Sequence, residues 1–198
     1  MAYPRSIQNL INYFSKLPTV GPKTAERYVF YLLQQGAEEL QGFAQAIAEL
    51  KEKITICKNC GAVSENNPCF ICTDKNRNKN IICVVANTRD MLAIERAKQY
   101  NGLYHILGGV INAVDDIGPE KLNINSLVEK IKKNGIQEII IALNPNMEGE
   151  TTAMHLIKIL KPFEIKITRI ARGLPTGSDL EYADETTINN ALKYRTDF

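Results

Sequence analysis

Four cysteines are the residues most clearly arranged for chemistry. They form two Cys-x-x-Cys pairs, Cys57 with Cys60 and Cys69 with Cys72, with residues 61–68 between them. Each pair places two sulfurs on one side of a metal ion, and zinc prefers four thiolates in a tetrahedron. Because protein ligands would fill every position, we expect one structural Zn²⁺ per chain. Redox-active thiols are the alternative interpretation.

The fifth cysteine, Cys83, stands apart from these pairs. It lies inside the apolar run Ile81–Val85, so we expect it to be a small core residue. An odd number of cysteines argues against a disulfide scaffold and favours metal binding in a reducing compartment.

A second pattern, LPTVGPKTA at residues 17–25, is typical of a site for phosphate. Gly21 is free to adopt a positive φ, and Pro22 suits the first position of a helix. Such a helix start directs unpaired N–H groups outward, and Lys23 and Arg27 add two cations on one helical face. The run resembles a helix-hairpin-helix, an element that binds the DNA backbone. An ordinary helical hairpin is the alternative, whereas a nucleotide P-loop lacks its required glycine spacing.

Positive charge collects near the N-terminus. The whole chain has 24 basic and 22 acidic side chains, a formal net charge of +2. Residues 1–35 contain one acid, Glu26, and four basic residues, which are Arg5, Lys16, Lys23 and Arg27. We therefore expect a polyanion to bind this part first, with Arg5 and Lys16 as additional phosphate contacts.

Three segments of different character must position these residues. Helical spacing of apolar residues predicts three helices within residues 4–50, separated by a turn at 18–22 and by Gly36, which ends the second helix. Residues 54–80 are too polar to form a core and need a metal. From residue 81, expected strands (81–85, 103–107, 138–143, 165–170) alternate with expected helices (90–100, 126–134, 151–160, 184–194), with a long surface loop at 108–125.

This alternation predicts a parallel β-sheet covered by helices. The fold class is therefore an α+β multi-module protein with four domains. These are a helix-hairpin-helix region (1–53), a four-cysteine zinc finger (54–80), an α/β domain (81–175) and a short C-terminal helical tail (176–198).

The α/β domain resembles the Toprim domain of topoisomerases, primases and some nucleases. In its active members, a glutamate after the first strand and an Asp-x-Asp pair after a later strand hold magnesium. The corresponding positions here are Ala86 and Asn144-Pro145-Asn146, so we expect a binding scaffold and no enzyme. The alternative is a magnesium-dependent nuclease or topoisomerase-like enzyme that uses Glu148, Glu150 and Asp90.

Other catalytic patterns are weak. His105 is expected in an apolar strand and His155 on a helix, and the chain lacks both a Gly-x-Ser-x-Gly elbow and a dinucleotide-binding Gly-x-Gly-x-x-Gly.

The order of the four modules resembles the RecR family of bacterial recombination mediators. Beyond the residues above, the resemblance rests on three runs, YHILGG (104–109), NPNMEGETTA (144–153) and RGLPTGSDLEYADE (172–185). One departure is Ala86, where family members usually carry glutamate.

The resemblance implies a clamp that binds single- and double-stranded DNA without sequence preference. It implies that the protein acts with RecO, and in some settings RecF, to load RecA onto single-stranded DNA coated by single-strand binding protein. It also implies self-association into a homotetrameric ring. Partner contacts are expected at Asn144, Glu148 and Glu150, and a pure protein adaptor that docks partners through this loop is a further possibility.

Composition agrees with a globular protein, since 44% of residues are hydrophobic and 23% charged. The sequence has no apolar run of about 18 to 20 residues and no secretory signal at its start, so we expect a cytoplasmic protein without a membrane partner, associated with the nucleoid when bound to DNA.

Overall fold

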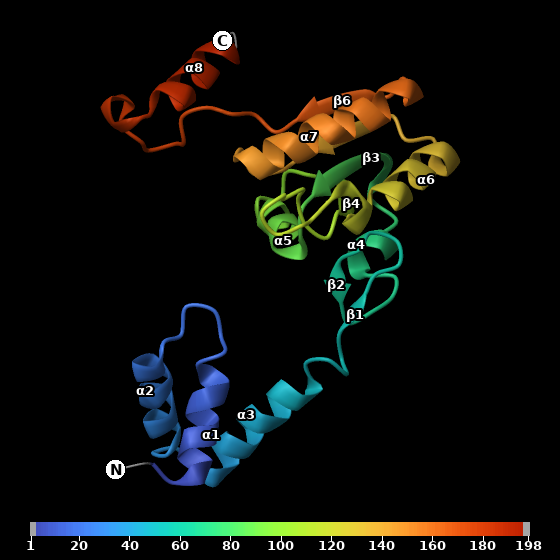
Figure 1. The fold of residues 1–198 in the computed structure, drawn as a ribbon. Helices are drawn as coiled ribbons and strands as arrows, with labels where there is room; N and C mark the ends of the chain where they lie inside the picture. Colours follow the sequence, from blue (N-terminus) through green and yellow to red (C-terminus); the bar gives the residue numbers. More distant parts are fainter. Residues whose placement is uncertain (1–2, 196–198) are drawn as a thin grey trace. The chain divides into compact units, whose positions relative to one another are not determined.

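The computed structural model describes residues 3–195, which form two compact units that divide after Ile54 (Figure 1). Among these residues, every helix is too short or too polar to cross a membrane.

The first unit contains three helices, α1 (Arg5–Phe14), α2 (Pro22–Leu32) and α3 (Ala37–Glu49). α1 and α2 pack as a hairpin around a core of Ile11, Ala25 and Val29. Every residue of α3 is exposed or half-buried. The three predicted helices are confirmed, but Gly36 does not end the second one. It instead precedes α3 as the N-cap with φ −67°, because α2 has already stopped at Leu32.

The second unit begins with the segment that carries the four cysteines. A short antiparallel hairpin joins β1 (Thr55–Ile56) to β2 (Val63–Ser64), and the one-turn helix α4 (Phe70–Thr73) follows. Each cysteine pair thus has its own small element, the hairpin for the first and α4 for the second. Elements this short cannot bury a core alone, which is the reason for a metal.

A four-stranded parallel sheet forms the centre of the second unit. Its strands are β3 (Asn78–Val85), β4 (Gly102–Ile106), β5 (Glu138–Ile141) and β6 (Lys166–Arg169), in the order β4-β3-β5-β6. The connecting helices are α5 (Thr88–Arg96), α6 (Ile124–Asn134) and α7 (Met147–Leu160). The predicted alternation of strands and helices is confirmed, as is the parallel sheet.

Strand alternation divides the core between the two faces of this sheet. In β3, Ile82 and Val84 belong to one core, whereas Cys83 and Val85 belong to the other, because successive side chains point to opposite faces. Residues of α6 and α7 fill the first core. The second core is filled from α5, from β4 and from the cysteine-bearing segment. The metal-binding segment therefore packs against the sheet rather than standing free.

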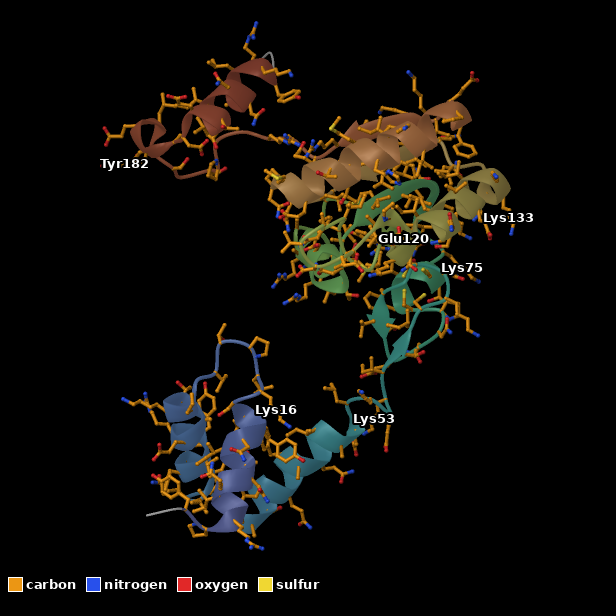
Figure 2. All side chains as sticks on the ribbon, in the orientation of Figure 1. Lys16, Lys53, Lys75, Glu120, Lys133 and Tyr182 are labelled. Carbon is orange, nitrogen blue, oxygen red and sulfur yellow. The ribbon has the colours of Figure 1, made fainter. Side chains whose placement is uncertain are left out.

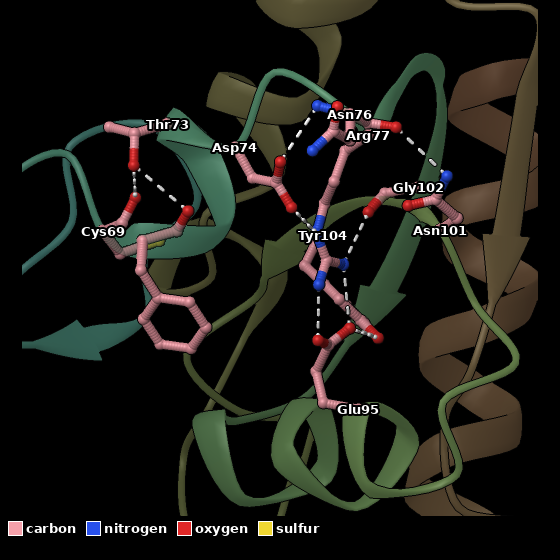
Figure 3. Close-up of polar contacts among 10 residues, drawn as sticks. Cys69, Thr73, Asp74, Asn76, Arg77, Glu95, Asn101, Gly102 and Tyr104 are labelled. Atoms are coloured by element: carbon pink, nitrogen blue, oxygen red, sulfur yellow. Dashed lines mark hydrogen bonds and ion pairs between the residues drawn. The ribbon is translucent and has the colours of Figure 1, made fainter.

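An ion pair ties the chain between α4 and β3 to helix α5 (Figure 3). The Arg77 guanidinium donates to both oxygens of Glu95 on α5, at 2.9 and 2.5 Å, and to the Gly102 carbonyl at 3.1 Å. The Tyr104 hydroxyl donates to Glu95 at 2.7 Å. The hydrogen bond from Arg77 lowers the pKa of Glu95. Both side chains are mostly shielded from water, so the pair holds the chain entering β3 against α5.

Two predicted boundaries differ from the structure. The expected surface loop at 108–125 contains a short 3₁₀ helix, η1 (Pro119–Lys121), and buries Leu122 and Ile124 in the first core. These two side chains pack with strand and helix residues that are distant in the chain, which an argument from local composition does not anticipate. The first strand starts at Asn78, earlier than the predicted Ile81. Its N-terminal residues are polar and exposed, so a prediction based on apolar runs did not include them.

The chain beyond the sheet forms the 3₁₀ turns η2 (Lys161–Phe163) and η3 (Leu180–Tyr182) and the helix α8 (Glu185–Lys193). Asp184 caps α8, because its carboxylate accepts from the Thr187 N–H at 2.9 Å. Most of this tail is exposed, including Leu180, Tyr182 and Leu192.

Candidate metal centre and nucleic-acid interface

The four predicted zinc ligands come together in one cluster. Their sulfur atoms all lie within 4.8 Å of one another. Cys57 Sγ lies 3.9 Å from Cys72 Sγ, and Cys60 Sγ lies 3.6 Å from Cys69 Sγ. A tetrahedral zinc site with Zn–S bonds of about 2.3 Å has S–S edges of about 3.8 Å. The cluster fits a structural Zn²⁺ held by Cys57, Cys60, Cys69 and Cys72, as the sequence predicts.

Backbone contacts shape the first cysteine pair. Gly61, with φ +83°, donates its N–H to the Cys57 carbonyl at 2.8 Å. A Cβ at this position would lie 3.1 Å from the Ile106 carbonyl oxygen, so only glycine fits without strain. Ile106 of β4 in turn donates its N–H to the Cys60 carbonyl at 2.7 Å. The metal centre is therefore joined directly to an edge strand of the sheet.

Cys83 lies outside this cluster, in β3, and is only 2% exposed. Burial raises the pKa of its thiol to about 12, so the group stays protonated at neutral pH. The prediction of a core residue is confirmed.

The turn before α2 does not reverse at its glycine. Gly21 has φ −79° and ψ 168°, so it does not use the positive φ that is open to glycine, and Thr19 is left-handed instead with φ +66°. The physical reason is that Gly21 is the N-cap of α2, a position that requires an extended conformation, so the chain reverses two residues earlier. Pro22 is the first residue of α2, as predicted.

This arrangement leaves the start of α2 open. Glycine has no side chain to accept from the N–H groups of the first turn, and no side-chain cap from the described part of the chain satisfies them. A Cβ on Gly21 would meet nothing within 4 Å, which leaves space for a ligand directly in front of the helix.

Three of the predicted DNA-binding cations lie near this helix start. Lys23 and Arg27 are exposed on the first turns of α2. Lys16 is exposed in the turn between α1 and α2 (Figure 2). Among the ion pairs of residues 3–195, none involves these side chains. Arg5 differs, because it begins α1 at the other end of the hairpin, about 15 Å along a helix of 10 residues.

The positions that carry metal-binding acids in active Toprim domains hold neutral side chains. Ala86 follows β3 and is buried, whereas Asn144 follows β5 and is exposed. Asn146 caps α7, since its Oδ1 accepts from the Gly149 N–H at 2.9 Å. Within residues 3–195, the group of His, Cys, Asp and Glu side chains close enough to share an ion is the four-cysteine cluster.

The two glutamates of the predicted partner-binding loop have different surroundings. α7 begins at Met147, so both lie in its first turn, where acids are favourable. Glu148 is half-buried. The Glu150 carboxylate accepts from Arg169, with Nη1 and Oε2 2.8 Å apart, and from Arg172. Glu150 thus holds the chain that leaves β6, which leaves Asn144 and Glu148 as the freer members of the set.

Reasoning from sequence did not single out Arg169 and Arg172 as partners of Glu150. The residues are 19 and 22 positions apart from it, and no local spacing links them. The sheet brings them together because β5 and β6 are neighbouring parallel strands.

Family models match the chain in the same modular order. The matches are to the helix-hairpin-helix of RecR (residues 7–51), the four-cysteine zinc finger domain of RecR (54–74), the Toprim domain (80–171) and the C-terminal region of RecR (173–196). Recombination protein RecR from Staphylococcus aureus strain MRSA252 is 48% identical over 197 residues, covering 100% of both chains. The protein of the same name from strain JH9 is also 48% identical over the same span. With its helical hairpin, four-cysteine zinc site and Toprim sheet in this order, the chain belongs to the RecR family of recombination proteins.

Proposed function

We propose that this chain is a non-enzymatic DNA clamp of recombinational repair, which holds the sugar-phosphate backbone at the start of α2. The observation that carries the proposal is the open helix start beside two exposed cations. Gly21 leaves the first-turn N–H groups accessible, and Lys23 and Arg27 flank them. N–H groups and cations of this kind bind phosphate without reading bases.

A single site of this size binds feebly, so the clamp needs several copies. Linked copies raise the effective concentration of each site, and a ring of four would surround the duplex or single strand. The exposed apolar residues of α3, Phe43 and Ile47, support self-association of the first unit. In the tail, Leu180 and Tyr182 support a second contact between copies.

The DNA-binding proposal is tested with the variant Lys23→Ala/Arg27→Ala, measured by fluorescence anisotropy on single- and double-stranded oligonucleotides. We expect at least a tenfold loss of affinity. We also expect affinity to depend less steeply on salt concentration, by the amount that corresponds to the loss of about two phosphate contacts. The matched control is Lys51→Ala/Lys53→Ala, which removes the same charge from the same unit. Equal losses in both variants would show that net charge alone drives binding.

The single variants Arg5→Ala and Lys16→Ala measure how much each of these two cations contributes to DNA affinity. Because Arg5 lies at the far end of α1, its loss is expected to weaken binding less than the loss of Lys16.

Self-association is tested by the mass of the protein in solution. Wild type is expected as a tetramer, and Phe43→Asp/Ile47→Asp as a smaller species. If the wild-type protein is a monomer in solution and still binds DNA as tightly as expected for the tetramer, that result would contradict the ring.

The loop at Asn144 and Glu148 is proposed to dock RecO, with RecF in some settings, so that the complex loads RecA onto single-stranded DNA coated by single-strand binding protein. Glu148→Lys should abolish pull-down of RecO and leave DNA affinity unchanged. This role places the protein in the bacterial cytoplasm, at the nucleoid.

The absence of catalysis is part of the proposal, since neutral Ala86 and Asn144 cannot draw magnesium out of its hydration shell. A plasmid nicking and relaxation assay with magnesium or manganese tests this directly. Turnover that Glu148→Ala removes would overturn it.

A further inference from the structure

Cys72 is the most accessible of the four zinc ligands. Cys57, Cys60 and Cys69 are 2% exposed or less, whereas Cys72 is half-buried. Cys72 lines a cavity of about 510 Å³, whose wall also includes Asn59 from the first cysteine pair and Lys130 from α6. α6 thus brings a cation to the cavity that Cys72 also lines.

Lys130 is held in that cavity by a buried histidine. Its Nζ lies 2.9 Å from Nδ1 of His105, a residue of β4 that is 1% exposed. Nε2 of the same ring lies 2.8 Å from the Asn123 carbonyl oxygen. A carbonyl only accepts hydrogen bonds, so Nε2 carries the ring proton and Nδ1 accepts from the ammonium. One assignment satisfies every group, with His105 neutral and Lys130 charged.

The environment of His105 agrees with this assignment. Burial, and then the charge of Lys130, lowers the pKa of His105 to about 4, so the ring is neutral at physiological pH. A neutral ring that accepts from an ammonium fixes the direction of the ammonium without adding charge.

A half-buried ammonium needs a counter-charge, and a carboxylate does not supply it here. Among the ion pairs of residues 3–195, none involves Lys130. Four thiolates outweigh the charge of one Zn²⁺, so the loaded metal centre is an anion. Burial lowers the pKa of Lys130, and the charges of Cys60, Cys72 and Cys57 oppose that effect. The anionic centre, which shares a cavity with Lys130, is therefore the candidate for that counter-charge.

We propose that Lys130, oriented by the neutral ring of His105, is a positioning residue that supplies the counter-charge of the zinc tetrathiolate on its Cys72 side. Groups outside the ligand set tune metal affinity in this way, typically by 10- to 100-fold. The proposal rests on the zinc site and is independent of DNA binding.

The test is metal affinity of the full chain, measured by competition with a chromogenic zinc chelator. Lys130→Met keeps the aliphatic stem and removes the charge, and we expect it to weaken zinc binding by about 10- to 100-fold. Lys130→Arg keeps the positive charge, so its zinc affinity should lie within a few-fold of that of wild type. The matched control is Lys133→Gln on the same helix, an exposed residue paired with Glu129 (Figure 2).

A second measurement distinguishes charge from packing. In Co²⁺-loaded protein, loss of a nearby cation makes the thiolates better donors, so the sulfur-to-cobalt charge-transfer band of Lys130→Met should move to longer wavelength. A packing defect would weaken binding without moving the band, and that outcome would overturn the proposal. Wild-type affinity in Lys130→Met, or an equal loss in Lys133→Gln, would also overturn it.

His105→Leu removes the acceptor that orients Lys130 and keeps a similar apolar volume. We expect a band shift in the same direction as in Lys130→Met, but smaller. An unshifted band in this variant would remove His105 from the proposal.

Discussion

The two units of this molecule bury very different amounts of apolar surface. The unit from residue 55 has cores of fifteen and eleven buried residues on the two faces of one sheet, and its metal ligands belong to the second core. The unit before it has a core of three, and every residue of α3 is exposed or half-buried. Most of the buried core therefore lies in the sheet unit, whereas the predicted DNA contacts lie on a unit with a core of three buried residues.

The largest expected effect is loss of the metal. Cys60→Ser should abolish zinc binding and destabilise the sheet unit by more than about 5 kcal/mol, because the ligands are also core residues. Thermal unfolding and zinc content measured together would check this. Cys83→Ala is the control, and it should keep its zinc and cost about 1 to 2 kcal/mol. A metal-free Cys60→Ser protein that melts cooperatively near the wild-type temperature would contradict the comparison.

The next effect concerns the ion pair that joins the chain between α4 and β3 to α5. Arg77→Met leaves Glu95 with the Tyr104 hydroxyl but without its cationic partner, and we expect a loss of about 2 to 3 kcal/mol in urea unfolding, less than for a fully buried pair because both side chains retain some exposure. Arg77→Met/Glu95→Met should recover part of this loss. Lys133→Met breaks an exposed pair and should cost no more than about 0.5 kcal/mol. Equal costs in the two single variants would show that the Arg77 pair is no stronger than a surface pair.

Acid should weaken the sheet unit through His105. Its folded pKa of about 4 lies below the ordinary value of 6.5, so the unfolded chain binds the proton more readily. The stability that depends on a neutral ring is present above pH 6.5 and is lost as pH falls towards 4. Between about pH 7 and 5.5 we expect wild type to lose about 1 kcal/mol more than His105→Leu does. Parallel pH slopes in the two proteins would show that His105 titrates normally.

The smallest expected effect concerns the stability of the first unit. Thr19 has a left-handed backbone, which costs a β-branched residue more than it costs glycine. Thr19→Gly should stabilise the first unit by about 0.5 to 1 kcal/mol and leave the unfolding of the sheet unit unchanged. Thr24→Gly, inside α2, should instead destabilise by about 0.3 to 0.5 kcal/mol, the difference between the helix propensities of threonine and glycine. If Thr19→Gly lowers stability, the left-handed turn is not strained.

Local patterns predicted much of this architecture. The cysteine spacing predicted the metal site, and the alternation of apolar runs predicted the parallel sheet and its helices. These features depend on residues close together in the chain, so periodicity and spacing reveal them. The backbone of the turn was harder, because whether Gly21 or Thr19 is left-handed depends on where α2 begins.

Contacts between distant residues were beyond such patterns. Glu150 meets Arg169 and Arg172 only after β5 and β6 pair, and Lys130 meets His105 only after α6 packs on the sheet. Local composition predicts neither of these pairings.

By itself, the sequence determined the module order, the ligands for zinc and the basic helix start, since each is a matter of residue type and short spacing. Only the tertiary structure decided which charges meet and which stay free. Packing chooses among many charged side chains, and it alone pairs Glu150 with two arginines, places Lys130 in the cavity that Cys72 lines and leaves Lys23 and Arg27 exposed to solvent.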